Sequence, residues 1–225
     1  MPQASTYFTD EQRTRIREAV AKAESRTAAE IVPVVASSSG RYDRAEDIVG
    51  LLTGLVLMAI TWRFYPRHWY ESGSWDGPSM SLELPALALA VLVGFLVGAA
   101  IASRIGWLRP LFTPRMQMRE EVNARARQAF FDDRVHHTKG ATGLLIFVSL
   151  YERTAVILAD EAITKHLGQG TLDDLCAGLV RKLHEGHAAE GLVETILAAG
   201  EHLAKTLPRE AGDVNELADA LILMD

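Results

Sequence analysis

The feature of this 225-residue sequence that most restricts its fold is an uncharged apolar stretch, Leu84–Ser103, which reads LPALALAVLVGFLVGAAIAS. A helix at the surface of a soluble domain has one apolar stripe, whereas this stretch is apolar on every side. At 1.5 Å rise per residue, a helix of roughly 20 residues crosses the roughly 30 Å hydrocarbon core of a bilayer. Gly94 and Gly98 form a small-xxx-small pair, which favours close approach of a second helix. The stretch therefore predicts a membrane span.

A second apolar segment, Ile48–Trp62, lies between Asp47 and Arg63. Its uncharged core of about 15 residues is short for a membrane span, and a buried core helix is the alternative interpretation. Arg63 can extend the usable length by snorkelling to the interface. A single crossing would separate two flanking sequences that we expect to form one domain. We therefore favour a transmembrane helical hairpin, with spans at about 48–65 and 84–104.

Basic residues around this hairpin predict its orientation. The connecting loop region offers only Arg63 and Arg67, diluted by Glu71, Asp76 and Glu83. Arginines are more numerous on the outer flanks, which carry Arg41, Arg44, Arg104, Arg109, Arg115 and Arg119. The positive-inside rule then predicts a two-pass protein with both termini in the cytoplasm. The single cysteine, Cys176, rules out an internal disulfide and fits a reducing compartment. No cleavable signal peptide is expected, because the N-terminus lacks a basic region followed by an apolar one.

The sequences on either side of the hairpin predict a domain of the α/β (α+β) class, with a small central mixed sheet flanked by helices. Thr9 and Gln12 form a plausible capping box at the start of an amphipathic helix. The segment Glu30–Ala36 is typical of a strand, although its proline favours an edge or a bulge. Gly143–Ser149 is an apolar run typical of a central strand, and Thr154–Ala159 continues it as a β-hairpin.

Further helices are expected at about 116–131, at 171–184 with Thr171 as its cap, and at 192–207. The tail 215–225 is expected to pack as a short final element. These elements divide the chain into residues 1–46, the first part of a soluble domain, 47–110, the membrane hairpin, and 111–225, the remainder of the soluble domain. The strand before the hairpin and those after it should share one sheet, because the latter would otherwise expose an edge to solvent.

The charge of the chain bears on its partners. A net charge of −6 argues against a nucleic-acid-binding surface, for which a basic domain is expected. One basic cluster lies beside the membrane segment: Arg115, Arg119, Arg125 and Arg127. It is a candidate site for anionic lipid headgroups or a partner, with about 1 kcal/mol per residue near the surface. The alternative is a solvated helix face that serves only as a topology signal.

Carboxylates near the strand ends are the candidate metal ligands. Asp160 follows the C-terminal end of a strand, where open α/β sheets tend to bind ligands, Glu161 adjoins it, and Glu30 begins the first strand. Hard divalent cations take carboxylate oxygens, so this set predicts a Ca²⁺ or Mg²⁺ site, or a phosphate-ester site. In the alternative, Asp160 caps the following helix and Glu30 pairs with Arg153.

Histidines and known catalytic motifs provide little support for catalysis. His184 and His187 are one residue too close for the HExxH zinc pattern, and Gly186 suggests a helix end between them. His136 and His137 point apart in an extended segment. Surface or helix-end roles are therefore favoured for both pairs. The sequence lacks a nucleophile elbow, a Walker loop and a dinucleotide fingerprint.

An ordered set of short phrases resembles the TPM-domain family of thylakoid, bacterial and animal membrane-associated proteins. The phrases are Thr27–Ile31, Thr142–Leu150, Glu152–Arg153 leading to Ile157–Asp160, and the spacing to Gly200, Pro208 and Asn215–Leu217. The resemblance covers nearly all the soluble sequence and implies an α/β domain in a bacterial-type inner membrane. Here the membrane hairpin is inserted after the first strand and not placed at one end.

The resemblance also bears on function, because some members are described as acid phosphatases or calcium binders. We expect a membrane-anchored cytoplasmic module without enzymatic activity, which acts through the bilayer and through protein partners or helps membrane complexes to assemble. The alternative is a divalent-metal-dependent, acid-phosphatase-like hydrolase that uses Asp160 and its neighbours. A purely structural subunit cannot be separated from the first hypothesis by sequence.

Overall fold

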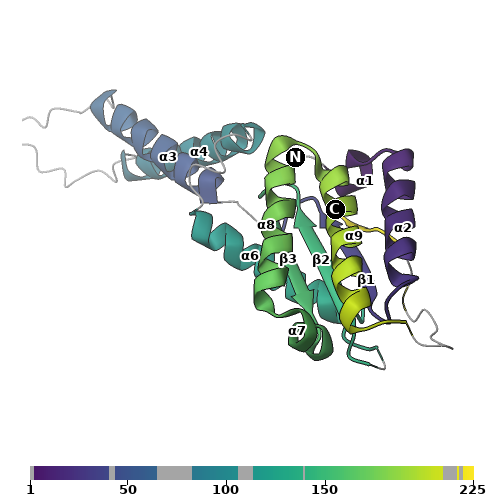
Figure 1. Ribbon diagram of the computed structural model, residues 1–225. Helices are drawn as coiled ribbons and strands as arrows, with labels where there is room; N and C mark the ends of the chain where they lie inside the picture. Colours follow the sequence, from purple (N-terminus) through teal and green to yellow (C-terminus); the bar gives the residue numbers. More distant parts are fainter. Residues whose placement is uncertain are drawn as a thin grey trace, which may run out of the picture. The chain divides into compact units, whose positions relative to one another are not determined.

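The computed structural model describes residues 3–40, 44–64, 83–105, 114–138, 140–209, 217 and 220–225 (Figure 1). The chain divides into two compact units, one of Met1–Arg41 with Arg115–Asp225 and the other of Tyr42–Pro114. The first unit is an α+β domain built on a small mixed sheet. The second consists of two apolar helices in the described residues.

The sheet of the first unit has four strands in the order β3-β2-β1-β4. They are β1 (Glu30–Ala36), β2 (Gly143–Ser149), β3 (Thr154–Ala159) and β4 (Ile222–Met224). Strand β1 is parallel to β2 and β4, whereas β3 is antiparallel to β2. The sequence-based prediction that strands from both sides of the insertion share one sheet is therefore confirmed.

The proline of β1 occupies a position that suits it. Strand β4 pairs only with Val34–Ala36, so in the described residues β1 has a strand neighbour on this side only after Pro33. Proline lacks the N–H that a ladder requires and is tolerated where a strand forms an edge. The predicted edge character therefore applies to residues 30–33 of β1, whereas Val34–Ala36 lie between β2 and β4.

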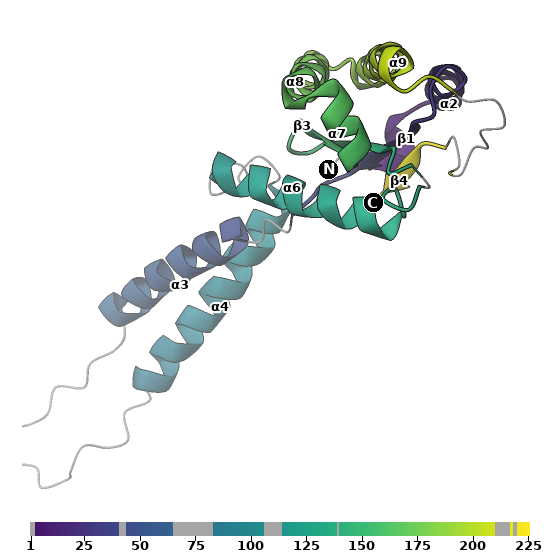
Figure 2. The ribbon, with the colours of Figure 1, turned by 60° about the horizontal axis from the view of Figure 1, so that its bottom comes forward.

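Helices cover the two faces of the sheet unequally, as Figure 2 shows. Helices α2 (Asp10–Glu24), α7 (Glu161–Leu167), α8 (Gln169–Glu185) and α9 (Ala188–Thr206), with the short α1 (Ala4–Tyr7), lie on one face. Helix α6 (Arg115–Asp132) packs on the other, where Val122, Ala126 and Ala129 are fully buried. Each face is apolar because alternate side chains of a buried strand point to opposite sides.

Several helix ends follow local chemistry and others depart from the prediction. The Thr9 hydroxyl accepts from the Gln12 backbone at 3.2 Å, and the Gln12 side chain accepts from the Thr9 backbone at 3.0 Å, which confirms the capping box. Thr171 is not a cap: α8 begins at Gln169, and the Thr171 hydroxyl donates to the Leu167 carbonyl at 2.9 Å. Helix α9 likewise begins earlier than predicted, at Ala188.

The second unit pairs α3 (Arg44–Phe64) with α4 (Glu83–Arg104) through glycines. A Cβ atom added at Gly94 would lie 2.7 Å from the Gly54 Cα atom, and one at Gly98 would lie 2.5 Å from the Thr53 hydroxyl oxygen. The close approach predicted from Gly94 and Gly98 is therefore present: Gly94 faces Gly54, and Gly98 faces Thr53 and Val49 on α3. By length and composition both helices can cross a membrane, over Glu46–Phe64 and Leu84–Arg104.

Candidate functional site

The predicted acidic residues lie at the amino edge of the parallel strands. Because β3 runs antiparallel to β2, its C-terminal end meets the N-terminal ends of β1 and β2, with Glu30 opposite Gly143. Asp160 does follow the C-terminal end of a strand, β3, as predicted, but the ligand-binding carboxyl edge of the parallel strands is formed by Ala36 and Ser149 at the opposite end.

Asp160 is fastened to the start of β2. Its Oδ2 atom accepts from the Gly143 backbone N–H at 3.3 Å, and its own N–H donates to the Gly143 carbonyl at 2.9 Å. Burial raises the pKa of the Asp160 carboxyl, against the opposing influence of the Gly143 N–H and His136. Asp160 occupies the N-cap position of α7, but its side chain makes no capping hydrogen bond, so this part of the alternative interpretation is corrected.

The partners predicted for Asp160 are only partly brought together. Glu30 is buried across from Gly143, and so it flanks the same residue as Asp160, whereas Glu161 is an exposed residue of the first turn of α7. Arg153 lies beyond the other end of β2, six residues or about 20 Å of strand away. The predicted Glu30–Arg153 pair is therefore wrong, and Arg153 is not among the neighbours of Asp160.

The metal site remains a prediction. Among the described residues, no group of three His, Cys, Asp or Glu side chains is arranged to hold a metal ion. Calcium takes six to eight oxygen ligands, and Asp160 already commits one oxygen to a backbone donor. The described carboxylates do not by themselves fit such an ion, and we derive no reaction step from it.

The four predicted arginines of α6 do not share one face. At about 100° per residue, Arg125 and Arg127 lie about 200° apart around the helix axis. Arg125 also donates to the Gln128 side-chain oxygen at 3.0 Å. Arg115 and Arg119 are one turn apart and both exposed at the start of the helix. A basic surface at this helix thus consists of Arg115 and Arg119, and the other two arginines are solvated separately.

The histidines lie at helix ends, as predicted. His184 is in the last turn of α8, with its Nδ1 atom 2.9 Å from the Val180 carbonyl. Gly186 ends the helix at a φ of 85°, and His187 then takes the N-cap position of α9. The His187 Nδ1 atom is 4.0 Å from the Glu190 carboxylate. These positions account for the pair without a metal.

Sequence reasoning missed a polar network at the carboxyl edge. Glu152 accepts from the Ser39 N–H at 2.9 Å and from the Ser149 hydroxyl at 2.5 Å, and the Ser39 hydroxyl donates to Ser149 at 2.8 Å. Beside it, the Ser37 hydroxyl donates to the Asp225 carboxylate at 2.7 Å. The run of serines after β1 predicted only the end of a strand, because its partners are more than a hundred residues away in the sequence.

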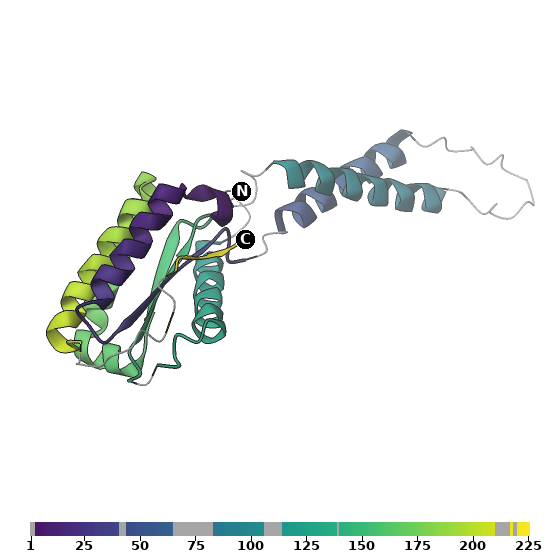
Figure 3. The same cartoon turned by 90° about the vertical axis from the view of Figure 1, so that its right-hand side faces the viewer.

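The same edge connects both ends of the described chain. The Ala4 N–H donates to the Ser37 hydroxyl at 2.7 Å, and the Ser5 N–H donates to the Asp225 carboxylate at 3.2 Å. Figure 3 shows the two ends beside each other at this end of the sheet. Hydrogen bonds from Ser5 and Ser37 lower the pKa of the Asp225 carboxyl, because they favour its ionised form.

A cavity of about 390 Å³ opens at this edge, next to the β2–β3 turn. Three separate segments form it: α1, the turn and the C-terminal end of α8. Its lining residues are Tyr7, Leu150, Tyr151, Arg153, Leu183, His184, Glu185 and Gly186. The volume lies within the range of small-molecule sites, about 300–1,000 Å³. No contiguous motif could have predicted it, since its walls come from distant parts of the sequence.

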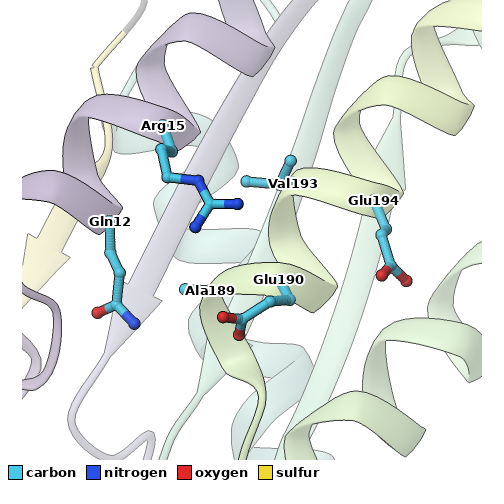
Figure 4. Close-up of a pocket in the computed structure, with 6 residues that line it drawn as sticks. All are labelled: Gln12, Arg15, Ala189, Glu190, Val193 and Glu194. Carbon is cyan, nitrogen blue, oxygen red and sulfur yellow. The ribbon is translucent and has the colours of Figure 1, made fainter.

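A smaller groove of about 130 Å³ follows the contact between α2 and α9 (Figure 4). The Arg15 side chain extends over it toward Val193, with Glu190 and Glu194 on the other wall. Glu194 is already paired with the Lys182 ammonium at 3.1 Å. At well under 300 Å³ the groove is too small for a typical ligand, so we regard it as an interhelical seam.

Comparisons with known proteins identify a fold and no family. No model of a known protein family matches the chain, and no curated protein matches it. Among solved structures, the NMR structure of the BA42 protein from the psychrophilic bacterium Bizionia argentinensis is similar, with a TM-score of 0.55 and 18% sequence identity. The match covers 96% of this chain and 94% of that protein. At this identity, the similarity extends to the fold alone.

Proposed function

We propose that this chain is a membrane-anchored module of the TPM-domain type, which binds partners from the cytoplasmic face of a bacterial-type inner membrane. In this proposal α3 and α4 form the anchor. The α/β unit, with both termini, stands in the cytoplasm and presents a binding surface for other proteins.

One observation carries the proposal: many large apolar side chains of α3 and α4 are exposed, although Phe95 and Val91 lie at the contact between the two helices. Glycines occupy the contact, whereas Leu52 and Leu96 on the outer faces are 55% and 58% exposed. Only 11% and 17% of the two apolar segments is buried, unlike the core helix of a soluble protein, which is mostly buried. Exposure of these apolar side chains to water would be unfavourable, whereas contact with the hydrocarbon chains of lipids has no such cost.

Binding of protein partners is supported by the exposed side chains of α6. Phe131 is 61% exposed at the C-terminal end, where its ring centroid lies 4.9 Å from that of His136. Met116 is 74% exposed at the start, between Arg115 and Arg119. Single exposed apolar residues are common on protein surfaces, so we base the proposal on the Phe131 end of α6, where rings gather because Phe130 and His136 lie beside Phe131.

Cysteine accessibility tests the anchor and its orientation. In a Cys176→Ser background, Ala21→Cys introduces a thiol on the exposed side of α2, and Ser74→Cys introduces one in the loop between the hairpin segments. A membrane-impermeant maleimide should label position 74 in intact spheroplasts and position 21 only after the spheroplasts are lysed. The reverse pattern would overturn the orientation, and extraction of the protein by alkaline carbonate without detergent would overturn the anchor.

Site-specific photocrosslinking tests the binding surface. A photoreactive residue at Phe131 should give a discrete crosslinked product in cells, because an exposed aromatic side chain in an interface contacts the partner directly. The same residue at Glu201, an exposed position of α9, is the matched control. Equal products from the two positions, or none from Phe131, would contradict the proposal for this surface.

A further inference from the structure

We propose that the carboxyl-edge cavity is a binding site for a small zwitterion, a molecule with an ammonium group and a phosphate or carboxylate group. The cavity is about 390 Å³ and lies beside the turn that joins β2 to β3. Its apolar floor consists of Leu150 and Leu183, both buried. In open α/β sheets, ligands bind outside the carboxyl ends of the parallel strands, and this is the edge where the cavity lies.

Two side chains of opposite charge line the cavity without pairing with each other. Arg153 comes from the strand turn and Glu185 from the last turn of α8. In the described part of the chain, the structure contains no ion pair of either side chain. Opposite charges that line one cavity and remain apart fit a ligand that carries both complementary charges.

Each of these two exposed charged residues favours one part of such a ligand. The C-terminal end of α8 carries the negative end of the helix dipole, which together with Glu185 attracts an ammonium group. The Arg153 guanidinium can donate two parallel hydrogen bonds to a phosphate or carboxylate. The ring of Tyr7 adds an aromatic wall, and the His184 Nε2 atom remains available because Nδ1 faces the Val180 carbonyl.

The backbone of Arg153 gives an independent reason to regard the turn as functional. Its φ of 48° lies in the left-handed region, which favours glycine or asparagine and has a cost for a long side chain. Such costs concentrate at binding and catalytic sites. An arginine at this position presents its guanidinium next to the cavity, whereas glycine would satisfy the turn and leave the cavity without a cation.

Calorimetric titration of the full chain in detergent micelles tests the proposal. The probes are O-phosphoethanolamine and β-alanine, and the controls are ethanolamine and inorganic phosphate, which carry charge of one sign only. We expect saturable millimolar or tighter binding of at least one zwitterion and at least tenfold weaker binding of both controls. No binding of either zwitterion, or equal binding of a control that carries charge of only one sign, would overturn the proposal.

Charge variants then locate the site. Arg153→Gln and Glu185→Gln should each weaken zwitterion binding at least tenfold, whereas Arg181→Gln, on the exposed side of the same helix, should change it less than twofold. Thiol labelling of Cys176 under denaturant verifies that each variant is folded. Unchanged binding in either cavity variant would overturn the two-ended arrangement. The natural ligand could be a lipid headgroup or a free small molecule, and titration in nanodiscs with and without phosphatidylethanolamine distinguishes the two. Weaker zwitterion binding in the nanodiscs that contain this lipid identifies a headgroup as the ligand, whereas equal binding in both identifies a free solute.

Discussion

Substitution of Gly143 by alanine should strongly destabilise the α/β unit while leaving the apolar hairpin intact. Gly143 is the first residue of the central strand β2, and its N–H donates to Asp160. A Cβ atom at this position would lie 2.0 Å from the Val135 carbonyl oxygen and 2.9 Å from the Val135 carbonyl carbon. Both are backbone atoms, which cannot rotate away as the end of a flexible side chain can.

The magnitude follows from the contacts that must change. Ordinary contact begins near 3.4 Å, so the two segments must separate by 3.4 − 2.0 = 1.4 Å. That shift breaks the 3.3 Å hydrogen bond to Asp160 and strains the 3.1 Å bond from the Val135 N–H to the Phe130 carbonyl. At about 1 kcal/mol for each bond, with a further contribution from partial exposure of the buried Val135 side chain, we expect a loss of about 2–4 kcal/mol.

The sequence provides a separate reporter for each unit. Cys176, the single cysteine, is half-buried in α8, its thiol donates to the Ala155 carbonyl at 3.2 Å, and burial raises its pKa. Pulsed thiol labelling against denaturant therefore measures unfolding of the α/β unit. All four tryptophans lie between Trp62 and Trp107, so tryptophan fluorescence reports on the hairpin segment. Gly143→Ala should lower the midpoint of the thiol curve and leave the fluorescence curve unchanged.

A matched glycine substitution provides the control. Gly178 lies inside α8, and a Cβ atom there would meet nothing within 4 Å. Because alanine is the better helix former, Gly178→Ala should stabilise the unit by about 0.5–1 kcal/mol. A loss of stability for Gly143→Ala together with a gain for Gly178→Ala would support the packing argument. An unchanged or raised midpoint for Gly143→Ala would refute it.

Three further predictions address the hairpin, the polar edge and pH. Gly94→Val should disrupt α3–α4 association, measured by energy transfer between labels on the two segments, because its side chain would overlap Gly54; Ala100→Val, on the exposed side of α4, should not. Ser149→Ala, which removes a fully buried hydroxyl with two hydrogen bonds, should lower stability by about 1–3 kcal/mol in the thiol assay, and wild-type stability would contradict the network. Asp133→Asn should stabilise the unit at pH 7, because burial and the neighbouring Asp132 carboxylate raise the pKa of Asp133 and so disfavour its ionised form. This gain in stability should vanish as the pH falls through the raised pKa to the ordinary value of 3.8, where the carboxyl is protonated in both the folded and the unfolded chain. A gain in stability that persists below pH 3.8 would contradict this cause.

Much of the local structure was encoded in contiguous residues. The strands Glu30–Ala36, Gly143–Ser149 and Thr154–Ala159 have the bounds that their apolar runs predicted, and the Thr9 capping box is present. The two apolar helices follow from length and composition in the same way. Such features need only the chemistry of neighbouring residues, which a strand or helix period displays directly.

The candidate sites depended on information of another kind. Asp160 was correctly assigned to a strand end, but the edge on which it lies depends on the direction of β2 relative to β1, which local patterns leave open. That direction also separated Glu30 from Arg153 by the length of β2. The separation of Arg125 from Arg127, by contrast, follows from the helix period alone and was available from the sequence.

By itself, then, the sequence determined the kinds of elements, most of their bounds and the segregation of apolar residues into a pair of helices. Only the tertiary structure decided which distant residues come together: the Ser39 and Ser149 hydroxyls, the Ala4 N–H with the Ser37 hydroxyl, and the lining of one cavity by both Arg153 and Glu185. The physical reason is that hydrophobic periodicity acts within an element, whereas a site requires the register and direction of elements that are distant in the chain.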